Sequence, residues 1–292
     1  MKNSCTIFLI LVASVGFAQS DKLETLKSSN KDWLVSPFEQ KATITNEGQN
    51  IVLNNGLVKR SFVLAPNVAC FDYMNLTNGQ QLIRSIEPEA KVVIDQITYK
   101  VGGLSGQKEK AYLQIDQIKN LQKADSDFVF SKYTIGKIEP FIKWKPTTWI
   151  GNAKQPTGAR IEFEYISPIA ALKNIIIKVH YEIYDGIPLI TKWISIQNNS
   201  NKSIKINRVV NEVLGLVEEE SAVVGKPEEM KKQHGIYVET NYAFNNAMRY
   251  DISDQTTHWK VDLAYTSQVN YNYETPCLLE IYPEKAPGID LA

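Results

Sequence analysis

The stretch KVHYEIYDGIPLITKWISIQNNSNKSIKI, residues 178–206, predicts three consecutive β-strands. Apolar and polar side chains alternate over residues 175–183, which places the apolar ones on one face of an extended chain. Asp185-Gly186 supplies a turn, and the chain returns over residues 189–196. After the polar segment NNSNKS a third strand is expected over residues 203–210. This part of the chain therefore predicts β-sheet.

The same alternation continues elsewhere in the chain. Residues 49–62 form two apolar runs around Asn54-Asn55-Gly56, and Asn-Gly is typical of a type I′ hairpin, in which both central residues have positive φ. A second hairpin is expected over residues 91–101, and a half-exposed strand over residues 160–165. The sequence thus indicates strand after strand.

Helix signals are few. Residues 111–123 have a rough helical stripe, and residues 227–233 have acidic residues first, basic residues last and Gly235 as a stop. We therefore predict an all-β fold, a large antiparallel β-sandwich (a super-sandwich) with one or two short helices. This single domain is expected to occupy residues 33–292.

The N-terminus is typical of a signal peptide over residues 1–18. Lys2 gives a positive start, residues 7–12 are a short apolar run, and Gly16-Phe17-Ala18 supplies small residues before the cleavage site. A polar lead-in is expected over residues 19–32. The apolar run is too short to span a bilayer, so no membrane span is expected, with a retained anchor as the alternative. The predicted location is secreted or periplasmic.

Charge and cysteine content exclude some classes of function. The chain has 292 residues, zero formal net charge and a pI near 6.8. No overall field attracts nucleic acid, so no nucleic-acid partner is expected. Beyond the signal peptide the cysteines are Cys70 and Cys277. Export would permit a disulfide between them, but a chain of this length needs none, so buried free thiols are favoured.

No common catalytic or metal-binding signature occurs in the sequence. HExxH and CxxC are absent, so no metal and no cofactor is expected. Residues 102–106, GGLSG, match neither a GxSxG elbow nor a phosphate loop, and favour a flexible loop. His180 is expected on the polar face of its strand, as a solvated or structural histidine. Trp193, inside a strand, is expected in the core.

Aromatic residues with polar neighbours indicate sugar binding. Aromatic rings cover the C–H faces of sugars, while amides and carboxylates bind the hydroxyls. Three segments have this composition: FIKWKPTTWIGN, residues 239–242 and residues 257–276. The candidate carbohydrate-binding residues are Trp144, Trp149, Asn241, Tyr242, His258 and Trp259. The alternative for each tryptophan is packing in the core or in a loop.

Glycoside chemistry would need two acids that flank one bond. The candidate acids are Glu162, Glu164, Glu182, Asp185, Glu212 and Glu239. The sequence does not pair them, so the catalytic residues stay unknown. In an alternative hypothesis, a histidine and a glutamate on a concave sheet face perform acid–base chemistry, with His180 or His258 acting beside Glu239.

Several segments carry a family resemblance. The segments NGLVKRSFVLAPNVACFDYMNLTNGQQLIRSIEPEA, YKVGGLSGQ, VHYEIYDGIPLITKWISIQNNS, YVETNYAF and HWKVDLAYTSQVNYNYETPCLLEI resemble the N-terminal β-domain of secreted bacterial proteins related to α-galactosidase-type (family 36) glycoside hydrolases. The pattern Tyr-x-x-Tyr-Asp-Gly-x-Pro-x-x-x-Lys-Trp is similar to strands of galactose-mutarotase-like super-sandwiches. In that family the catalytic aspartates lie in a (β/α)₈ barrel, which this sequence does not contain, so no catalytic residue is carried over.

The resemblance and the aromatic segments together predict a secreted carbohydrate-associated β-sandwich domain. It would be an accessory or sugar-binding part of a glycoside-hydrolase-like protein and not catalytic by itself. The expected partners are an oligo- or polysaccharide and a catalytic barrel domain or partner chain. Two alternatives stay open: a mutarotase-like or glycosidase enzyme that uses a His/Glu pair, and a structural domain that packs against a partner.

Overall fold

A computed structural model describes residues 32–140, 156–218, 235–241, 256–266, 275–283 and 289–291. The strands within these residues are β1 Thr43–Glu47, β2 Asn50–Asn54, β3 Val58–Val63, β4 Ala69–Asn75, β5 Gln80–Gln81, β6 Ile83–Ser85, β7 Ala90–Ile94, β8 Ile97–Val101, β9 Val129–Lys137, β10 Gly158–Ile166, β11 Ile175–Tyr184, β12 Ile190–Asn198, β13 Ile204–Val210, β14 Glu212–Leu216, β15 Thr257–Lys260, β16 Leu278–Ile281 and β17 Ile289–Leu291. The predicted signal peptide lies outside the described residues.

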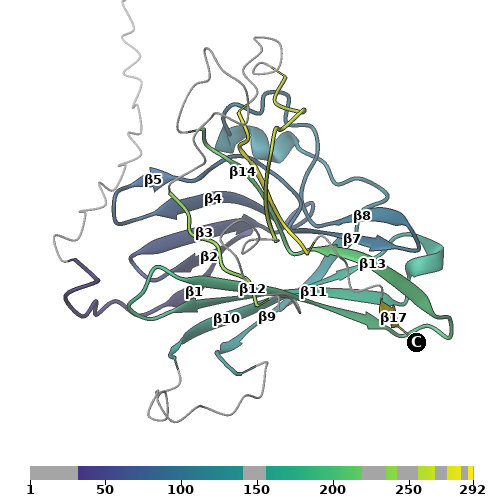
Figure 1. Ribbon diagram of the computed structural model, residues 1–292, viewed down its shortest axis with the longest axis horizontal. Helices are drawn as coiled ribbons and strands as arrows, with labels where there is room; N and C mark the ends of the chain where they lie inside the picture. Colours follow the sequence, from purple (N-terminus) through teal and green to yellow (C-terminus); the bar gives the residue numbers. More distant parts are fainter. Residues whose placement is uncertain are drawn as a thin grey trace, which may run out of the picture.

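The chain is all-β, as predicted, but the prediction of one large sandwich is wrong. The strands form four small sheets, with the orders β1-β2-β3-β4-β5, β12-β11-β10-β9, β17-β13-β7-β8 and β15-β16-β14-β6. They are arranged like the four blades of a propeller, although two of these sheets join strands from distant parts of the chain. Figure 1 shows one such case, with β13 beside β7.

The stretch at residues 178–206 shows why the prediction failed. It does form strands, and β11 pairs with β12 in antiparallel register from Ile175↔Asn198 to Ile183↔Ile190. However, β13 leaves this sheet and pairs with β7 and β17. Alternation of polar and apolar residues specifies a strand and its buried face, but it does not specify which distant strand lies beside it.

Both predicted hairpins are confirmed, but the turn of the first differs from expectation. Asp95 and Gln96, between β7 and β8, have φ values of 47° and 70°, as a type I′ turn requires. In the turn at Asn54-Asn55-Gly56 only Gly56 has positive φ. There the Asn55 Oδ1 atom accepts hydrogen bonds from the backbone N–H groups of Leu57 and Val58, at 3.0 and 2.9 Å. Side-chain hydrogen bonding thus stabilises this turn.

The main hydrophobic core receives side chains from all four sheets. At its centre the ring of Phe62 lies 5.3 Å from that of Phe163 and 5.1 Å from that of Tyr181. The predicted free thiols are confirmed, because Cys70 and Cys277 are both buried and unpaired. Burial is the main cause that raises the pKa of Cys70 to about 12.

Helix is scarce in the described residues, as predicted. The expected helix at residues 111–123 is reduced to a short 3-10 helix, η1 Ile115–Asn120, and a second one, η2 Ala170–Leu172, was not expected. The expected helix at residues 227–233 lies outside the described residues. Within the part of the chain that the structure describes, no helix is long and apolar enough to cross a membrane.

Candidate functional site

The predicted sugar-binding residues are only partly described by the structure. Trp144, Trp149 and Tyr242 lie outside the described residues. Asn241 is exposed, and so is Glu239, the acid expected beside a histidine. For these five residues the sugar-binding and acid–base hypotheses stay predictions.

His258 and Trp259 are neighbours in β15 and therefore point to opposite faces of the strand. The His258 Nε2 atom lies 2.9 Å from the Tyr282 carbonyl oxygen, and the two rings stack with centroids 3.9 Å apart. Trp259 is partly buried and packs against the main core. These two residues do not form a shared aromatic platform.

A different group of side chains gathers on the polar face of the β9–β12 sheet. Glu162, His180 and Trp193 are direct cross-strand neighbours on β10, β11 and β12. We call these three residues the polar ladder. His180 was expected on this face, and it is there, but it is buried, with only 4% of its surface exposed. Trp193 was expected in the core but is instead half-buried on this face.

His180 joins the three members of the ladder. Its ring stacks on that of Trp193, with centroids 4.8 Å apart and an interplanar angle of 4°. Its Nδ1 atom lies 3.2 Å from the Glu162 Oε2 atom, and its Nε2 atom lies 2.9 Å from the Ser195 Oγ atom. The Arg160 Nη2 atom, which only donates, also lies 3.4 Å from Nδ1, but the Glu162 carboxylate, which only accepts, is closer. We therefore assign the proton to Nδ1 and let Nε2 accept from the hydroxyl.

The electrostatics of the ladder follow from burial and from nearby cations. Burial is the main cause that lowers the pKa of His180 to about 4, so the ring is neutral at pH 7. Burial acts to raise the pKa of Glu162, but Lys178, His180 and Arg160 outweigh it and hold this pKa below its usual value. The ladder therefore consists of a carboxylate, a neutral imidazole and an indole.

Charged side chains of both signs flank the ladder on the same face. The Lys178 Nζ atom lies 2.7 Å from the Glu162 Oε1 atom. The Arg160 guanidinium lies 5.4 Å from the centroid of the Trp193 ring, within the range of a cation–π contact. One strand pair further along, the Lys132 Nζ atom lies 3.4 Å from Glu164. The face thus presents hydrogen-bond donors and acceptors around one aromatic ring.

Glu162 and His180 were predicted from the sequence as separate candidates, and their contact was not predicted. The signal that could have paired them is the register of two adjacent predicted strands. If residues 160–165 and 175–183 form a hairpin, their polar positions face the same side, and Glu162 meets His180. Trp193 was misassigned because alternation along β12 is imperfect.

No group of three or more His, Cys, Asp or Glu side chains that could hold a metal ion is found in the described ranges. No family model matches the chain, and no curated protein matches it either. Among solved structures, the chain is weakly similar to the GH36 α-galactosidase AgaB from Geobacillus stearothermophilus, with a TM-score of 0.37 and 12% sequence identity. The match covers 59% of this chain and 25% of that enzyme, and at this level of similarity it carries no argument about family or function.

Proposed function

We propose that this chain is a carbohydrate-binding domain, exported to the periplasm or the cell exterior, and an accessory part of a glycoside-hydrolase-like protein. Its sugar-binding surface is the polar face of the β9–β12 sheet. The observation that carries this proposal is the polar ladder, in which a half-buried indole stacks on a neutral histidine beside a carboxylate.

The chemistry of the face suits a neutral saccharide. An aromatic ring with a polar surround packs on the C–H face of a sugar, while hydroxyls both donate and accept hydrogen bonds. Stacking on His180 holds the Trp193 ring in one orientation, which reduces the conformational entropy lost on binding.

The charges on this face also favour a neutral ligand. They occur as ion pairs: Lys178 and Arg160 lie 2.7 and 3.5 Å from Glu162, and Lys132 lies 3.4 Å from Glu164. Because each of these acids has a cation beside it, the face offers hydrogen bonds of both kinds without a strong net field. A polyanionic or polycationic chain would gain little there.

The test is a titration of the full chain with a panel of neutral α- and β-linked oligosaccharides, followed by calorimetry and tryptophan fluorescence. We expect saturable binding that Trp193→Ala weakens by at least about tenfold, which is about 1.4 kcal/mol. Trp33→Ala is the matched control, because Trp33 is also half-buried but lies in a different part of the chain. Absence of binding across the panel, or an equal loss in both variants, would overturn the proposal.

Acid–base catalysis is the second candidate function, favoured by the 3.2 Å distance between Glu162 and His180. It ranks second because both ring nitrogens of His180 already have partners and the residue is 4% exposed. Polarimetry of pure sugar anomers tests it directly. If the protein accelerates anomer interconversion and Glu162→Gln abolishes the effect, the domain is an enzyme; an unchanged rate removes this candidate.

A further inference from the structure

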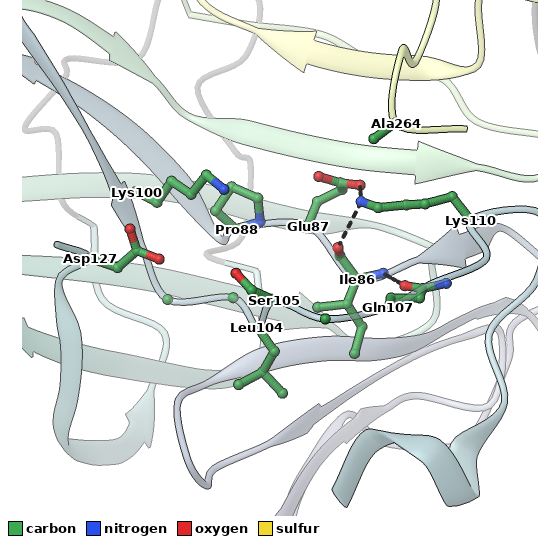
Figure 2. A pocket seen from close by; sticks show the side chains of 13 residues that line it. Ile86, Glu87, Pro88, Lys100, Leu104, Ser105, Gln107, Lys110, Asp127 and Ala264 are labelled. Carbon is green, nitrogen blue, oxygen red and sulfur yellow. Dashed lines mark hydrogen bonds and ion pairs between the residues drawn. The ribbon is translucent and has the colours of Figure 1, made fainter. Parts of the chain in front are cut away.

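A small pocket lies away from the polar ladder, beside the glycine-rich segment 102–106. Its volume is about 230 Å³, and the residues around it come from segment 86–88, β8, segment 102–107, Lys110, Asp127 and Ala264. Figure 2 shows Glu87 and Lys110 at one end, Asp127 and Lys100 at the other, and Leu104 and Ser105 along one side.

The glycine-rich segment is fixed in place, contrary to the flexible loop that the sequence indicated. The backbone N–H of Gly103 donates to the Val68 carbonyl at 2.6 Å. Ser105 and Gln122 exchange backbone hydrogen bonds of 2.7 and 2.9 Å. Gly103 has a φ of 81°, and a Cβ atom there would lie 2.7 Å from the Pro88 Cα atom. One wall of the pocket is therefore formed before any ligand binds.

Gln107 ties the next part of the loop to β6. Its Oε1 atom accepts from the Ile86 backbone N–H at 3.0 Å, and its Nε2 atom donates to the Glu109 carbonyl at 2.9 Å. A glutamine with both ends engaged holds this side of the pocket rigid. Preformed binding sites lose less conformational entropy when they bind a ligand.

The loop does not form an anion cradle. An anion site of this kind needs free backbone N–H groups that converge on one point. Here the N–H groups of Gly102, Gly103 and Ser105 already donate to the carbonyls of Phe128, Val68 and Gln122. Phosphate or sulfate would have to break these hydrogen bonds.

Each end of the pocket carries one acidic side chain and one lysine. Lys110 forms an ion pair with the Oε1 atom of Glu87, and that oxygen also accepts from the Ser85 hydroxyl at 3.0 Å. At the other end Asp127 is 6% exposed, and Lys100 is the cation that interacts with it. Burial is the main cause that raises the pKa of Asp127 above its usual value.

These features select the class of ligand. A charged molecule would have to compete with the Glu87–Lys110 ion pair, whereas a hydroxyl can donate to one of these groups and accept from the other. Pro88, Leu104 and Ala264 provide apolar contacts for C–H groups. Sites for drug-sized ligands have volumes of about 300–1,000 Å³, so this pocket of about 230 Å³ fits a smaller molecule.

We propose that this pocket is a second binding site, which takes one neutral polyol the size of a single monosaccharide ring between Glu87–Lys110 and Asp127–Lys100. It shares no residue with the polar ladder and does not depend on the function proposed for that face. The domain would thus bind an extended saccharide on its sheet and a single ring in this pocket.

The test uses glucose, galactose and myo-inositol as probes for the full chain, with saturation-transfer NMR and calorimetry as readouts. We expect saturable binding of at least one probe. Ala264→Trp should abolish it, because Ala264 is an exposed residue whose side chain faces the pocket, so that added bulk fills the space without disturbing the core. Leu263→Trp is the matched control, since Leu263 is 76% exposed and does not line the pocket.

Two further variants separate this proposal from the first. Asp127→Asn keeps the shape of the side chain and should weaken binding of the probe by about tenfold, through loss of a charged acceptor. Trp193→Ala should leave the affinity for the probe unchanged. If Trp193→Ala instead weakens binding of the probe, the sugar ring binds on the polar face, and the proposal of a second site in the pocket is wrong. Absence of saturable binding by all three probes, unchanged binding in Ala264→Trp, or binding of inorganic phosphate in place of the polyols would each overturn it as well.

Discussion

The two faces of the β9–β12 sheet have similar chemistry but differ in their exposure to solvent. On the outer face His180 and Trp193 lie beside Glu162 and Lys178, and the Lys178 side chain is 30% exposed. On the inner face Tyr181, the next residue along β11, lies within the main core. Strand β11 therefore contributes to a group of charged and aromatic side chains on each face, one at a partly exposed surface and one in the interior.

The inner group is built around Arg60 and Glu212. Their closest atoms are 2.6 Å apart, and Lys192 lies 2.7 Å from the same glutamate. Arg60 also lies 4.9 Å from the centroid of the Tyr181 ring, and Tyr181 donates a hydrogen bond to Glu89. The side chains of Arg60, Lys192 and Glu212 are 3%, 6% and 8% exposed.

Exposure decides what each group can do. Desolvation offsets most of the attraction within a buried ion pair, but removing one partner leaves an uncompensated buried charge. Burial acts to raise the pKa of Glu212, but Arg60 and Lys192 outweigh it and lower this pKa, so the glutamate stays charged in the interior. The outer group uses the same types of residue, and its Lys178 and Glu162 side chains are 30% and 17% exposed, although His180 itself is buried.

The largest expected effect comes from breaking the inner group. Arg60→Met should lower the free energy of unfolding by about 3–5 kcal/mol, because it leaves the buried Glu212 with Lys192 as its remaining cation. Urea denaturation measures this change. Lys178→Met on the outer face is the control, and an equal loss in the two variants would remove the distinction between the faces.

The next largest effect is a pH dependence that originates at His180. Its pKa is about 4 in the folded protein against an ordinary 6.5, so its contribution to stability is complete above about pH 6.5 and is lost as the pH falls through 4. This contribution is about 2–3 kcal/mol. Unfolding free energies at pH 7 and pH 4.5 should differ more in the wild type than in His180→Gln; parallel curves would show that the histidine is not buried in its neutral form.

A smaller effect on stability is expected at Trp193. Trp193→Ala should cost about 1–2 kcal/mol, because the half-buried ring loses its stacking on His180 but leaves no closed cavity. Thermal and chemical unfolding both measure this change. A loss above about 4 kcal/mol would mean that the ring is a core residue after all, as its sequence context indicated.

The smallest effect is expected at the exposed end of the outer face. Lys132 contacts Glu164 at 3.4 Å, but 66% of its side chain is exposed. Lys132→Ala should therefore change the unfolding free energy by less than about 0.5 kcal/mol. A larger change would show that the charges of this face contribute to the fold, and that exposure does not separate the two faces.

The sequence predicted the elements better than their assembly. The strands over residues 160–165 and 175–183 and the hairpin over residues 91–101 could be predicted, because local alternation and turn residues specify them. The partner of β13 could not, because pairing with β7 joins segments far apart in the chain. One large sandwich was therefore expected where four small sheets exist.

The candidate site shows the same division. Composition predicted a sugar-binding site in the aromatic segments. Of the residues predicted there, His258 stacks on Tyr282 and Trp259 packs against the core. The ladder instead combines Glu162, His180 and Trp193, whose closeness arises from cross-strand register. No local sequence pattern specifies that register. It follows only when the two strands are correctly predicted to pair as a hairpin.

The most direct test of the central claim is the oligosaccharide titration of the wild type and Trp193→Ala, with Trp33→Ala as control. We expect saturable binding of a neutral oligosaccharide by the wild type and by Trp33→Ala, and at least a tenfold weaker affinity, about 1.4 kcal/mol, for Trp193→Ala. Binding that is unaffected by the loss of Trp193, or no binding across the panel, would contradict the assignment of the polar face as a sugar-binding surface.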